Sequence, residues 1–134
     1  MQTQQFGIAI LRIMVGIVFT AHGAQKLFVL GIGAVTHMFH GLGIPWPHIA
    51  AIVVTLVEFV GGIALILGLL TRYAALLLAI DMAVAVGKVH LHNGFFLNKG
   101  GYEYALTLLA ASVALALTGP GSPALGRLAK SGRR

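Results

Sequence analysis

The sequence contains no cysteine and only three acidic residues among its 134. The lack of cysteine excludes disulfide bonds, thiolate metal sites and cysteine redox chemistry by this chain. Charged residues make up 9% of the chain and hydrophobic residues 58%, and the mean hydropathy of +0.94 exceeds that of soluble domains. The composition therefore indicates a membrane protein, and any redox role needs a cofactor or a partner.

The formal net charge of +6 does not indicate a nucleic-acid partner. Four of the nine basic residues lie in the terminal stretch "GRLAKSGRR", a clustering that is typical of a topology signal. No charged or Ser/Pro-rich linker divides the chain. We therefore expect one domain over residues 1–134, with a basic cytoplasmic tail at 119–134.

Four apolar runs are long enough to cross a bilayer core, which takes about 20 helical residues. They predict an all-α fold, a four-transmembrane-helix bundle with spans at about residues 7–30, 49–70, 73–90 and 102–118. The connector after the first run could form a short interfacial helix around Met38. Small residues recur every seven positions at Ala9, Gly16 and Gly23, a spacing that predicts close helix packing.

The basic residues predict the orientation of the bundle. Arg12, Arg72 and the tail lie on the side of the termini, whereas Lys26, Lys88 and Lys99 lie on the other side. By the positive-inside rule both termini are cytoplasmic, in a multi-pass protein. All six histidines then belong to the outer half or the outer loops.

Each of the three acids falls in a different predicted span: Glu58 in the second, Asp81 in the third and Glu103 at the start of the fourth. A lone carboxylate in hydrocarbon costs at least about 2.5 to 3.5 kcal/mol on insertion scales. These side chains should therefore face the interior of the bundle and be paired or protonated.

Depth along the helices suggests partners for the acids. At about 1.5 Å per residue, Arg12 lies about 8 Å from the cytoplasmic end, Asp81 about 13 Å, Glu58 about 20 Å and His22 about 22 Å. These depths predict that Arg12 reaches Asp81 and that Glu58 meets His22, with Lys26 as a further candidate partner. Arg12, His22 and Lys26 also share a sector of about 80° on the first helix.

Helical phase makes a second prediction for the third span. Asp81, Lys88 and His92 align within about 40°, whereas His90 points to the opposite side. Glu103 is level with His90, His92 and the nearby Lys99. We therefore predict a polar pocket in the outer half of the bundle.

The same polar residues could instead have purely structural roles. The pairs could only fix helix register, Lys26 could extend to the outer interface, and Glu103 could pair only with Lys99. The "HLH" at 90–92 is a weak metal motif because the two rings of such a pair point apart in a helix. No metal site is therefore predicted.

Seven segments together resemble the DoxX family of small integral membrane proteins. They are "LRIMVG", "TAHGAQKLF", "FHGLGIPWP", "VEFVGGIALILGLLTRYAAL", "HLHNGFF", "GYEYALTLLAASVAL" and "GPG". The chain departs from the family pattern after "GPG", where it has "SPALGR". The resemblance implies a four-helix protein of the bacterial inner membrane linked to oxidoreductase complexes, oxidative stress or thiol homeostasis. It also implies family polar positions at Arg12, His22, Lys26, Glu58, Arg72, His90 and Glu103.

These observations favour a membrane subunit of a redox-linked system, with a pocket that binds a quinone or a sulfur oxyanion. The candidate ligand-binding residues are His22, Lys26, Glu58, Arg12, Asp81, His90 and Glu103. The alternatives are a small-solute or proton-coupled transporter and a non-catalytic scaffold that docks soluble oxidoreductases. Haem or metal would need histidines on facing helices, such as His22 and His90. Whether the chain is catalytic, and whether it forms a homodimer in the lipid bilayer, stays open.

Overall fold

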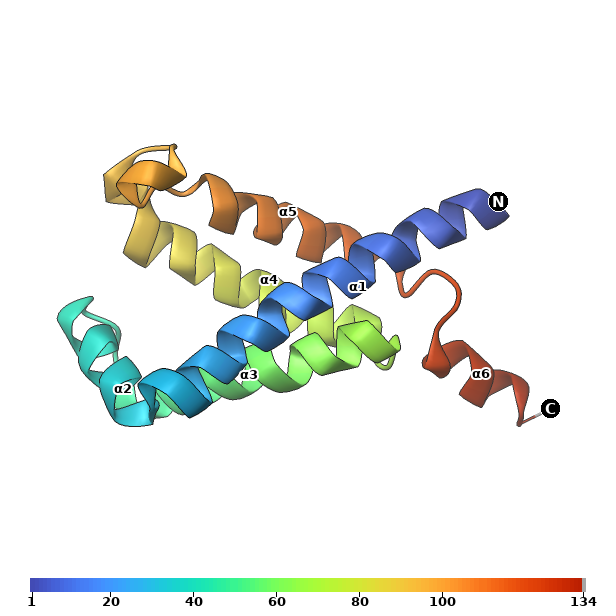
Figure 1. Ribbon diagram of the computed structural model, residues 1–134, viewed down its shortest axis with the longest axis horizontal. Helices are drawn as coiled ribbons and strands as arrows, with labels where there is room; N and C mark the ends of the chain where they lie inside the picture. The colour runs from blue at the N-terminus through green and yellow to red at the C-terminus, as the bar shows by residue number, and fades with distance from the viewer. Residues whose placement is uncertain (134) are drawn as a thin grey trace.

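The computed structural model describes residues 1–133, which form helices and no strand. The all-α prediction is confirmed; Arg134 of the predicted tail lies outside the described residues. The α-helices are α1 (Gln2–Ala24), α2 (Ile32–Gly41), α3 (Pro47–Leu67), α4 (Thr71–Ala85), α5 (Glu103–Thr118) and α6 (Leu125–Ser131) (Figure 1). The π-helices η1 (Gln25–Leu30) and η2 (Val86–His90) extend α1 and α4, and the 3-10 turns η3 (Leu91–Asn93) and η4 (Leu97–Lys99) lead to α5.

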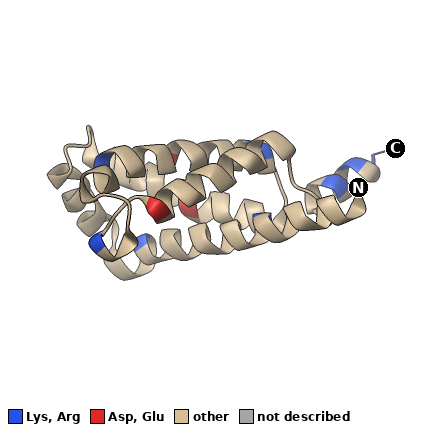
Figure 2. Ribbon diagram, turned by 90° about the horizontal axis from the view of Figure 1, so that it is seen from above, with Lys and Arg blue, Asp and Glu red and all other residues tan. Residues whose placement is uncertain are grey.

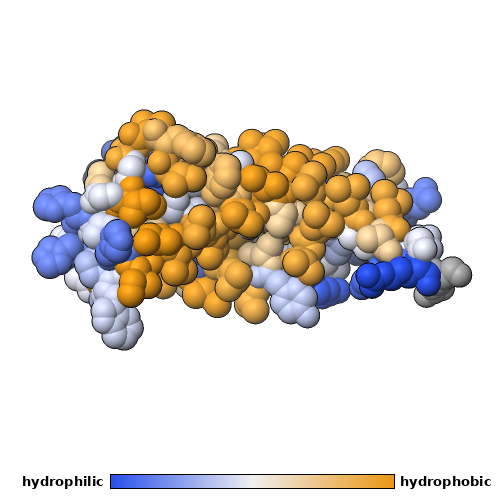
Figure 3. Space-filling model, turned by 90° about the horizontal axis from the view of Figure 1, so that it is seen from below, coloured by the Kyte–Doolittle hydropathy of each residue, from blue (hydrophilic) through white to orange (hydrophobic). Residues whose placement is uncertain are grey.

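Three continuous helices are long and apolar enough to cross a membrane: Gln2–Leu30, Pro47–Leu67 and Thr71–Asn93. The fourth predicted span corresponds to α5, an apolar helix of 16 residues. Its length of about 24 Å falls short of a bilayer core of about 30 Å, so its crossing stays a prediction. Figure 3 shows hydrophobic side chains over the middle of the molecule and hydrophilic ones at its two ends, as lipid immersion requires.

Two helix pairs make up the long body of the molecule, α1 with α3 and α4 with α5. Glycines bring the backbones of α1 and α3 together. A Cβ atom added at Gly16 would lie 2.7 Å from the carbonyl oxygen of Gly62, and one added at Gly23 would overlap the backbone of Phe59. The packing role predicted for Gly16 and Gly23 is thus confirmed, and these contacts fix the height of α1 against α3.

The α4–α5 pair is held by small and aliphatic side chains. The buried residues of α5 follow a spacing of three or four, which gives one inward face: Ala105, Leu108, Ser112 and Leu115. Ala75 and Leu78 of α4 are fully buried in the same hydrophobic core. Toward the end with α2 and η2 the two helix pairs separate, as Figure 1 shows.

A short turn joins α3 to α4 and sets their register. Gly68 ends α3 in the left-handed region with φ of 71°, a conformation that glycine adopts without steric cost. Glu58 lies nine residues before the end of α3, and Asp81 lies ten residues after the start of α4. Because the two helices run back along each other, both carboxyl groups lie at nearly the same height. The predicted difference in depth between them is wrong, because it was counted from separate span ends and not from the shared turn.

Arg12 does not pair with Asp81, contrary to the prediction. Its guanidinium donates hydrogen bonds to the carbonyl oxygens of Pro120 and Pro123, the second at 2.9 Å. Arg12 lies beside the α3–α4 turn, since a Cβ added at Gly68 would be 2.9 Å from its Nη1. Asp81 is ten residues farther along α4, which corresponds to about 15 Å. Arg12 therefore ties α1 to the segment that follows α5.

The two ends of the described chain lie at the same end of the molecule (Figure 1). Arg72 also lies there, and its guanidinium donates to the carbonyl oxygens of Ala116 at 3.1 Å and Leu117 at 2.6 Å. A cation in this position complements the carbonyl end of α5. Figure 2 places basic positions near both ends of the molecule and acidic positions between them.

Replacement of Gly16 by valine should lower the unfolding temperature in detergent, because the added methyl groups force α1 away from α3. We expect a loss of about 1–3 kcal/mol, the usual cost of overpacking. Gly7→Val is the matched control on the same helix, since nothing lies within 4 Å of a Cβ added at Gly7. Equal stability of the two variants would show that the close α1–α3 contact is absent.

Candidate functional site

A pocket of about 660 Å³ lies where the two helix pairs separate, away from the termini. Its volume is in the usual range of small-molecule sites, about 300 to 1,000 Å³. Side chains of α1, α2, α3, α4 and α5 form mostly apolar walls: Phe19, Met38, Phe39, Ile44, Val53, Val54, Val57, Leu77, Ile80, Met82, Val84 and Leu108. Six histidine, lysine and acidic side chains also line it: His22, Lys26, Glu58, Asp81, Lys88 and His90.

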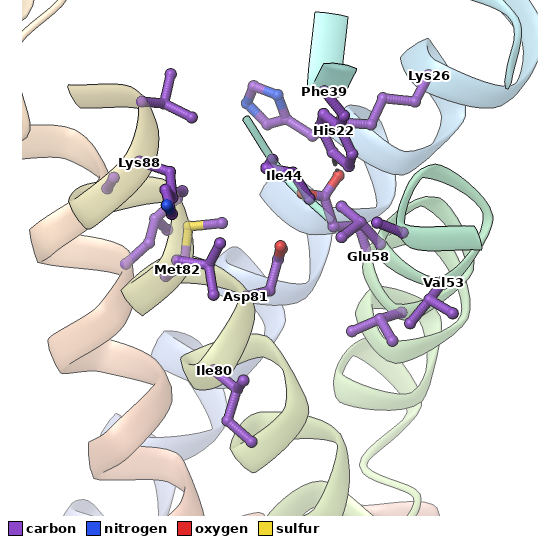
Figure 4. A pocket seen from close by; sticks show the side chains of 18 of the residues that line it. His22, Lys26, Phe39, Ile44, Val53, Glu58, Ile80, Asp81, Met82 and Lys88 are labelled. Carbon is purple, nitrogen blue, oxygen red and sulfur yellow. Dashed lines mark hydrogen bonds and ion pairs between the residues drawn. The ribbon is translucent and has the colours of Figure 1, made fainter. Parts of the chain in front are cut away.

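Lys26 and Glu58 form an ion pair at the base of this pocket, with 2.7 Å between Nζ and Oε2 (Figure 4). The Glu58 side chain is 4% exposed and that of Lys26 is 16% exposed. The hypothesis that Glu58 meets Lys26 is therefore confirmed in the structure, and Lys26 does not simply extend to the outer interface. Pairing offsets part of the large cost of removing two charges from water.

Asp81 faces the same space from the opposite wall of the pocket (Figure 4). It lies close enough to Glu58 and Lys26 to interact with both. One of its oxygens, Oδ2, is buried and has no hydrogen-bond partner among the described residues. The base of the pocket thus holds two carboxyl groups, one ammonium group and one free acceptor.

Three of the four lysine and histidine side chains of the pocket belong to the two π-helices. Lys26 belongs to η1, and both Lys88 and His90 belong to η2. A π-helix bonds residue i to i+5, so it turns side chains away from the direction that an α-helix gives them, and such segments often occur at functional sites. This change of phase explains why His90 lines the pocket together with Lys88, although α-helical phase predicted that it points to the opposite side.

Two histidines complete the outer part of the pocket. The ring of His22 lies 6.3 Å from that of Tyr104, measured between centroids, and makes no hydrogen bond to Glu58 within the described part of the chain. Nδ1 of His90 donates to the carbonyl oxygen of Gly100 at 2.9 Å. That bond leaves Nε2 of a neutral His90 as an acceptor.

Other candidate residues lie away from the pocket. Glu103 begins α5, where its negative charge is stabilised by the positive end of the helix dipole. It makes no ion pair with Lys99 among residues 1–133. Arg12 and Arg72 both bind backbone carbonyls near the termini. The pocket therefore unites five of the seven predicted site residues: His22, Lys26, Glu58, Asp81 and His90.

No metal centre is formed by the described residues. They contain no group of three or more histidine, cysteine or acidic side chains placed to hold an ion. His37, His40 and His48 are exposed on α2 and at the start of α3. His48 instead lies 3.4 Å from the hydroxyl of Thr36 through its Nδ1.

Sequence reasoning missed two parts of the pocket. Met38 and Phe39 of α2 and Ile44 after it form one wall, because α2 folds back against α3 and buries Phe39 in a second apolar cluster. The apolar spacing of Val35 and Phe39 was the available signal for that buried face. Lys88, which helical phase predicts on the face of Asp81, lines the pocket although it is not among the predicted site residues.

Comparison with known proteins shows the family of the chain. A family profile described as DoxX matches residues 7–91. The Bacillus subtilis protein named "Putative oxidoreductase CatD" is 33% identical over 115 residues, which cover 86% of this chain and 81% of the relative. A Mycobacterium tuberculosis protein described as an uncharacterized membrane protein is 36% identical over 130 residues, with coverage of 87% and 77%.

A third relative is the Escherichia coli inner membrane protein YqjF, 28% identical over 125 residues and 93% of each chain. No solved structure matches the chain. The profile covers well over half of the sequence and includes all five predicted site residues that line the pocket. The apolar helices, the polar pocket and these relatives agree: the chain belongs to the DoxX family of membrane proteins.

Proposed function

We propose that this DoxX protein is a membrane subunit of a redox-linked system and that its pocket binds a quinone-like ring. The observation that carries the proposal is an apolar pocket with the Lys26–Glu58 ion pair and Asp81 at its base. Apolar walls suit a ring, and a few polar groups suffice to orient it. The name of the Bacillus subtilis relative, an oxidoreductase, supports a redox role.

The carboxyl groups supply the proton chemistry that a quinone needs. Reduction of a quinone to a quinol takes up two electrons and two protons. Glu58 and Asp81 are placed to exchange protons with ring oxygens, and Lys26 holds Glu58 in position. The chain has no cysteine that could supply electrons. The electrons therefore come from a partner oxidoreductase subunit or from a bound cofactor.

A sulfur oxyanion fits this base less well than a ring does. The charge of Lys26 is already paired with Glu58, and Asp81 adds a second carboxyl group at the same height. Lys88 is the other lysine of the pocket and lies seven residues beyond Asp81, toward the outer end. An anion at the base would therefore meet like charges, whereas an uncharged ring would not.

Proton-coupled transport is the second candidate function, and the neighbouring carboxyl groups favour it. The pocket nevertheless occupies only the half of the molecule away from the termini. In the other half the close α1–α3 contacts and the α4–α5 core fill the interior.

A non-catalytic scaffold for soluble oxidoreductases is the other alternative. Such a scaffold would need no ligand in the pocket.

For the membrane arrangement we propose one domain with four crossings, α5 being the fourth, and with both termini in the cytoplasm of a bacterium. Support comes from the basic residues at the end of the termini, among them Arg12, Arg72, Arg127 and Lys130. The inner-membrane relative in Escherichia coli supports the inner membrane as the location. The outer pocket then faces the periplasmic half of the bilayer.

The ligand proposal predicts that decylubiquinone binds the protein in phosphatidylcholine nanodiscs. Glu58→Gln and Phe39→Ala should each raise the Kd by about tenfold or more, as loss of one hydrogen bond or one apolar contact would. Leu76→Ala is the control, since Leu76 is exposed on α4 and outside the pocket. Unchanged Kd values in both pocket variants would exclude a ring at this site.

The ion pair predicts strong coupling between Lys26 and Glu58 in a double-mutant cycle. Lys26→Met or Glu58→Gln alone leaves an unbalanced buried group and should destabilise the protein by up to about 3–5 kcal/mol. The double variant should lose clearly less than the sum, as measured by unfolding in detergent. Lys99→Met, at an exposed position of η4, is the matched control. Additive losses would mean that the two groups do not interact.

The orientation predicts the pattern of cysteine labelling in a chain that has no cysteine of its own. A membrane-impermeant maleimide added to intact cells, with the outer membrane opened, should label His37→Cys and spare Ser131→Cys. Disruption of the inner membrane should make both positions reactive. The opposite pattern in intact cells would reverse the assigned orientation, and labelling of both would contradict an even number of crossings.

A further inference from the structure

The pocket is open sideways between α3 and α4. Four of its apolar side chains are also exposed at the surface: Val53 by 52%, Leu77 by 51%, Ile80 by 55% and Val84 by 47%. Val53 belongs to α3 and the other three to α4. Ile80 adjoins Asp81 on α4, so the opening is at the height of the carboxyl groups. At that height the surroundings of a membrane protein are lipid.

A second hollow continues the opening along α4. It has a volume of about 620 Å³ and shares Ile80, Val84 and Lys88 with the pocket. Gly87 also lines it, and nothing lies within 4 Å of a Cβ added there. The two hollows therefore adjoin each other along α4, where Ile80 and Val84 line both of them.

The base of the pocket has a specific chemical requirement. Glu58 is engaged by Lys26 at 2.7 Å, whereas Oδ2 of Asp81 is buried without a partner among the described residues. A buried acceptor that lacks a donor loses free energy relative to water, by about 1–3 kcal/mol. A ligand that donates a hydrogen bond to Oδ2 of Asp81 would remove that penalty.

We propose that the occupant of this pocket enters from the bilayer between α3 and α4 and donates a hydroxyl group to Asp81. The occupant is an uncharged amphiphile with a hydroxyl on an apolar ring, such as a phenol or a quinol. The proposal rests on the proposed ligand site and narrows its chemistry to the hydroxyl-bearing form. It also assigns a route through lipid, with Ile80 and Val84 at the opening.

The hydroxyl requirement is tested with two ligands that differ only in the donor. A photoreactive 4-alkylphenol and its methyl ether are equilibrated with the protein in phosphatidylcholine nanodiscs, and cross-linking is quantified by peptide mass spectrometry. The phenol should bind about tenfold more tightly than the ether, the effect of one hydrogen bond. Asp81→Leu should abolish this preference. Equal binding of phenol and ether to the unmodified protein would overturn the role of Asp81, whether or not the variant folds.

The route is tested by the rate of cross-linking after the phenol is added in separate lipid vesicles. Ile80→Trp and Val84→Trp narrow the opening and should slow the approach to equilibrium by about tenfold. Leu76→Trp adds the same side chain to α4 at an exposed position outside the pocket and should leave the rate unchanged. Unchanged rates in the two opening variants would overturn the lateral route.

The outcomes for this inference and for the proposed function are distinguishable. Phenol binding that depends on Asp81, without binding of decylubiquinone, would support the hydroxyl site and contradict the quinone proposal. Binding of decylubiquinone with equal binding of phenol and ether would support the quinone proposal and contradict the hydroxyl requirement. Cross-links found only on side chains outside the pocket would contradict both.

Discussion

The ion pair between Lys26 and Glu58 is the contact on which the functional half of this protein depends. Either charge alone would be costly within an apolar bundle, since an unpaired buried ion is disfavoured by several kcal/mol. Together they join the end of the first long helix to the second. They also engage one carboxyl group of the pocket and leave Asp81 as its free acceptor.

Two features of the backbone make this contact possible. The glycines of α1 set the height of that helix against α3, which brings the next turn, with Lys26, beside Glu58. The short turn after α3 then returns the chain at a register that puts Asp81 opposite Glu58. The polar base of the pocket thus results from three helices whose relative heights are fixed by close packing and one turn.

Much of the fold could be predicted from the sequence, because the signals are strong and local. Apolar runs of span length predicted the long helices, and glycines at seven-residue spacing predicted the close contact of Gly16 and Gly23 with α3. All three acids fall in predicted spans. Because a carboxylate in hydrocarbon is costly, this position indicated that Glu58 and Asp81 need partners. Five of the seven candidate residues accordingly meet in one pocket.

The errors concern relations between helices. Arg12 was matched to Asp81 by depths counted from separate span ends, although the α3–α4 turn is the common origin for Glu58 and Asp81. The carbonyl oxygens of Pro120 and Pro123 could not be anticipated as its partners, because they depend on the fold of a segment more than 100 residues away. His90 was misplaced because no sequence pattern indicated a π-helix at residues 86–90.

The base of the ligand pocket depends on a bond between Lys26 and Glu58 in the lipid bilayer. Solid-state NMR of the protein in bilayers, with 15N in lysine side chains and 13C in glutamate carboxyl groups, measures that contact directly. With only two glutamates in the chain, Glu103→Gln assigns the signal of Glu58. A hydrogen bond between the two groups gives a strong dipolar coupling, with a nitrogen-to-carbon distance of about 3.5 Å. A mobile Lys26 ammonium with no coupling to Glu58 would contradict it.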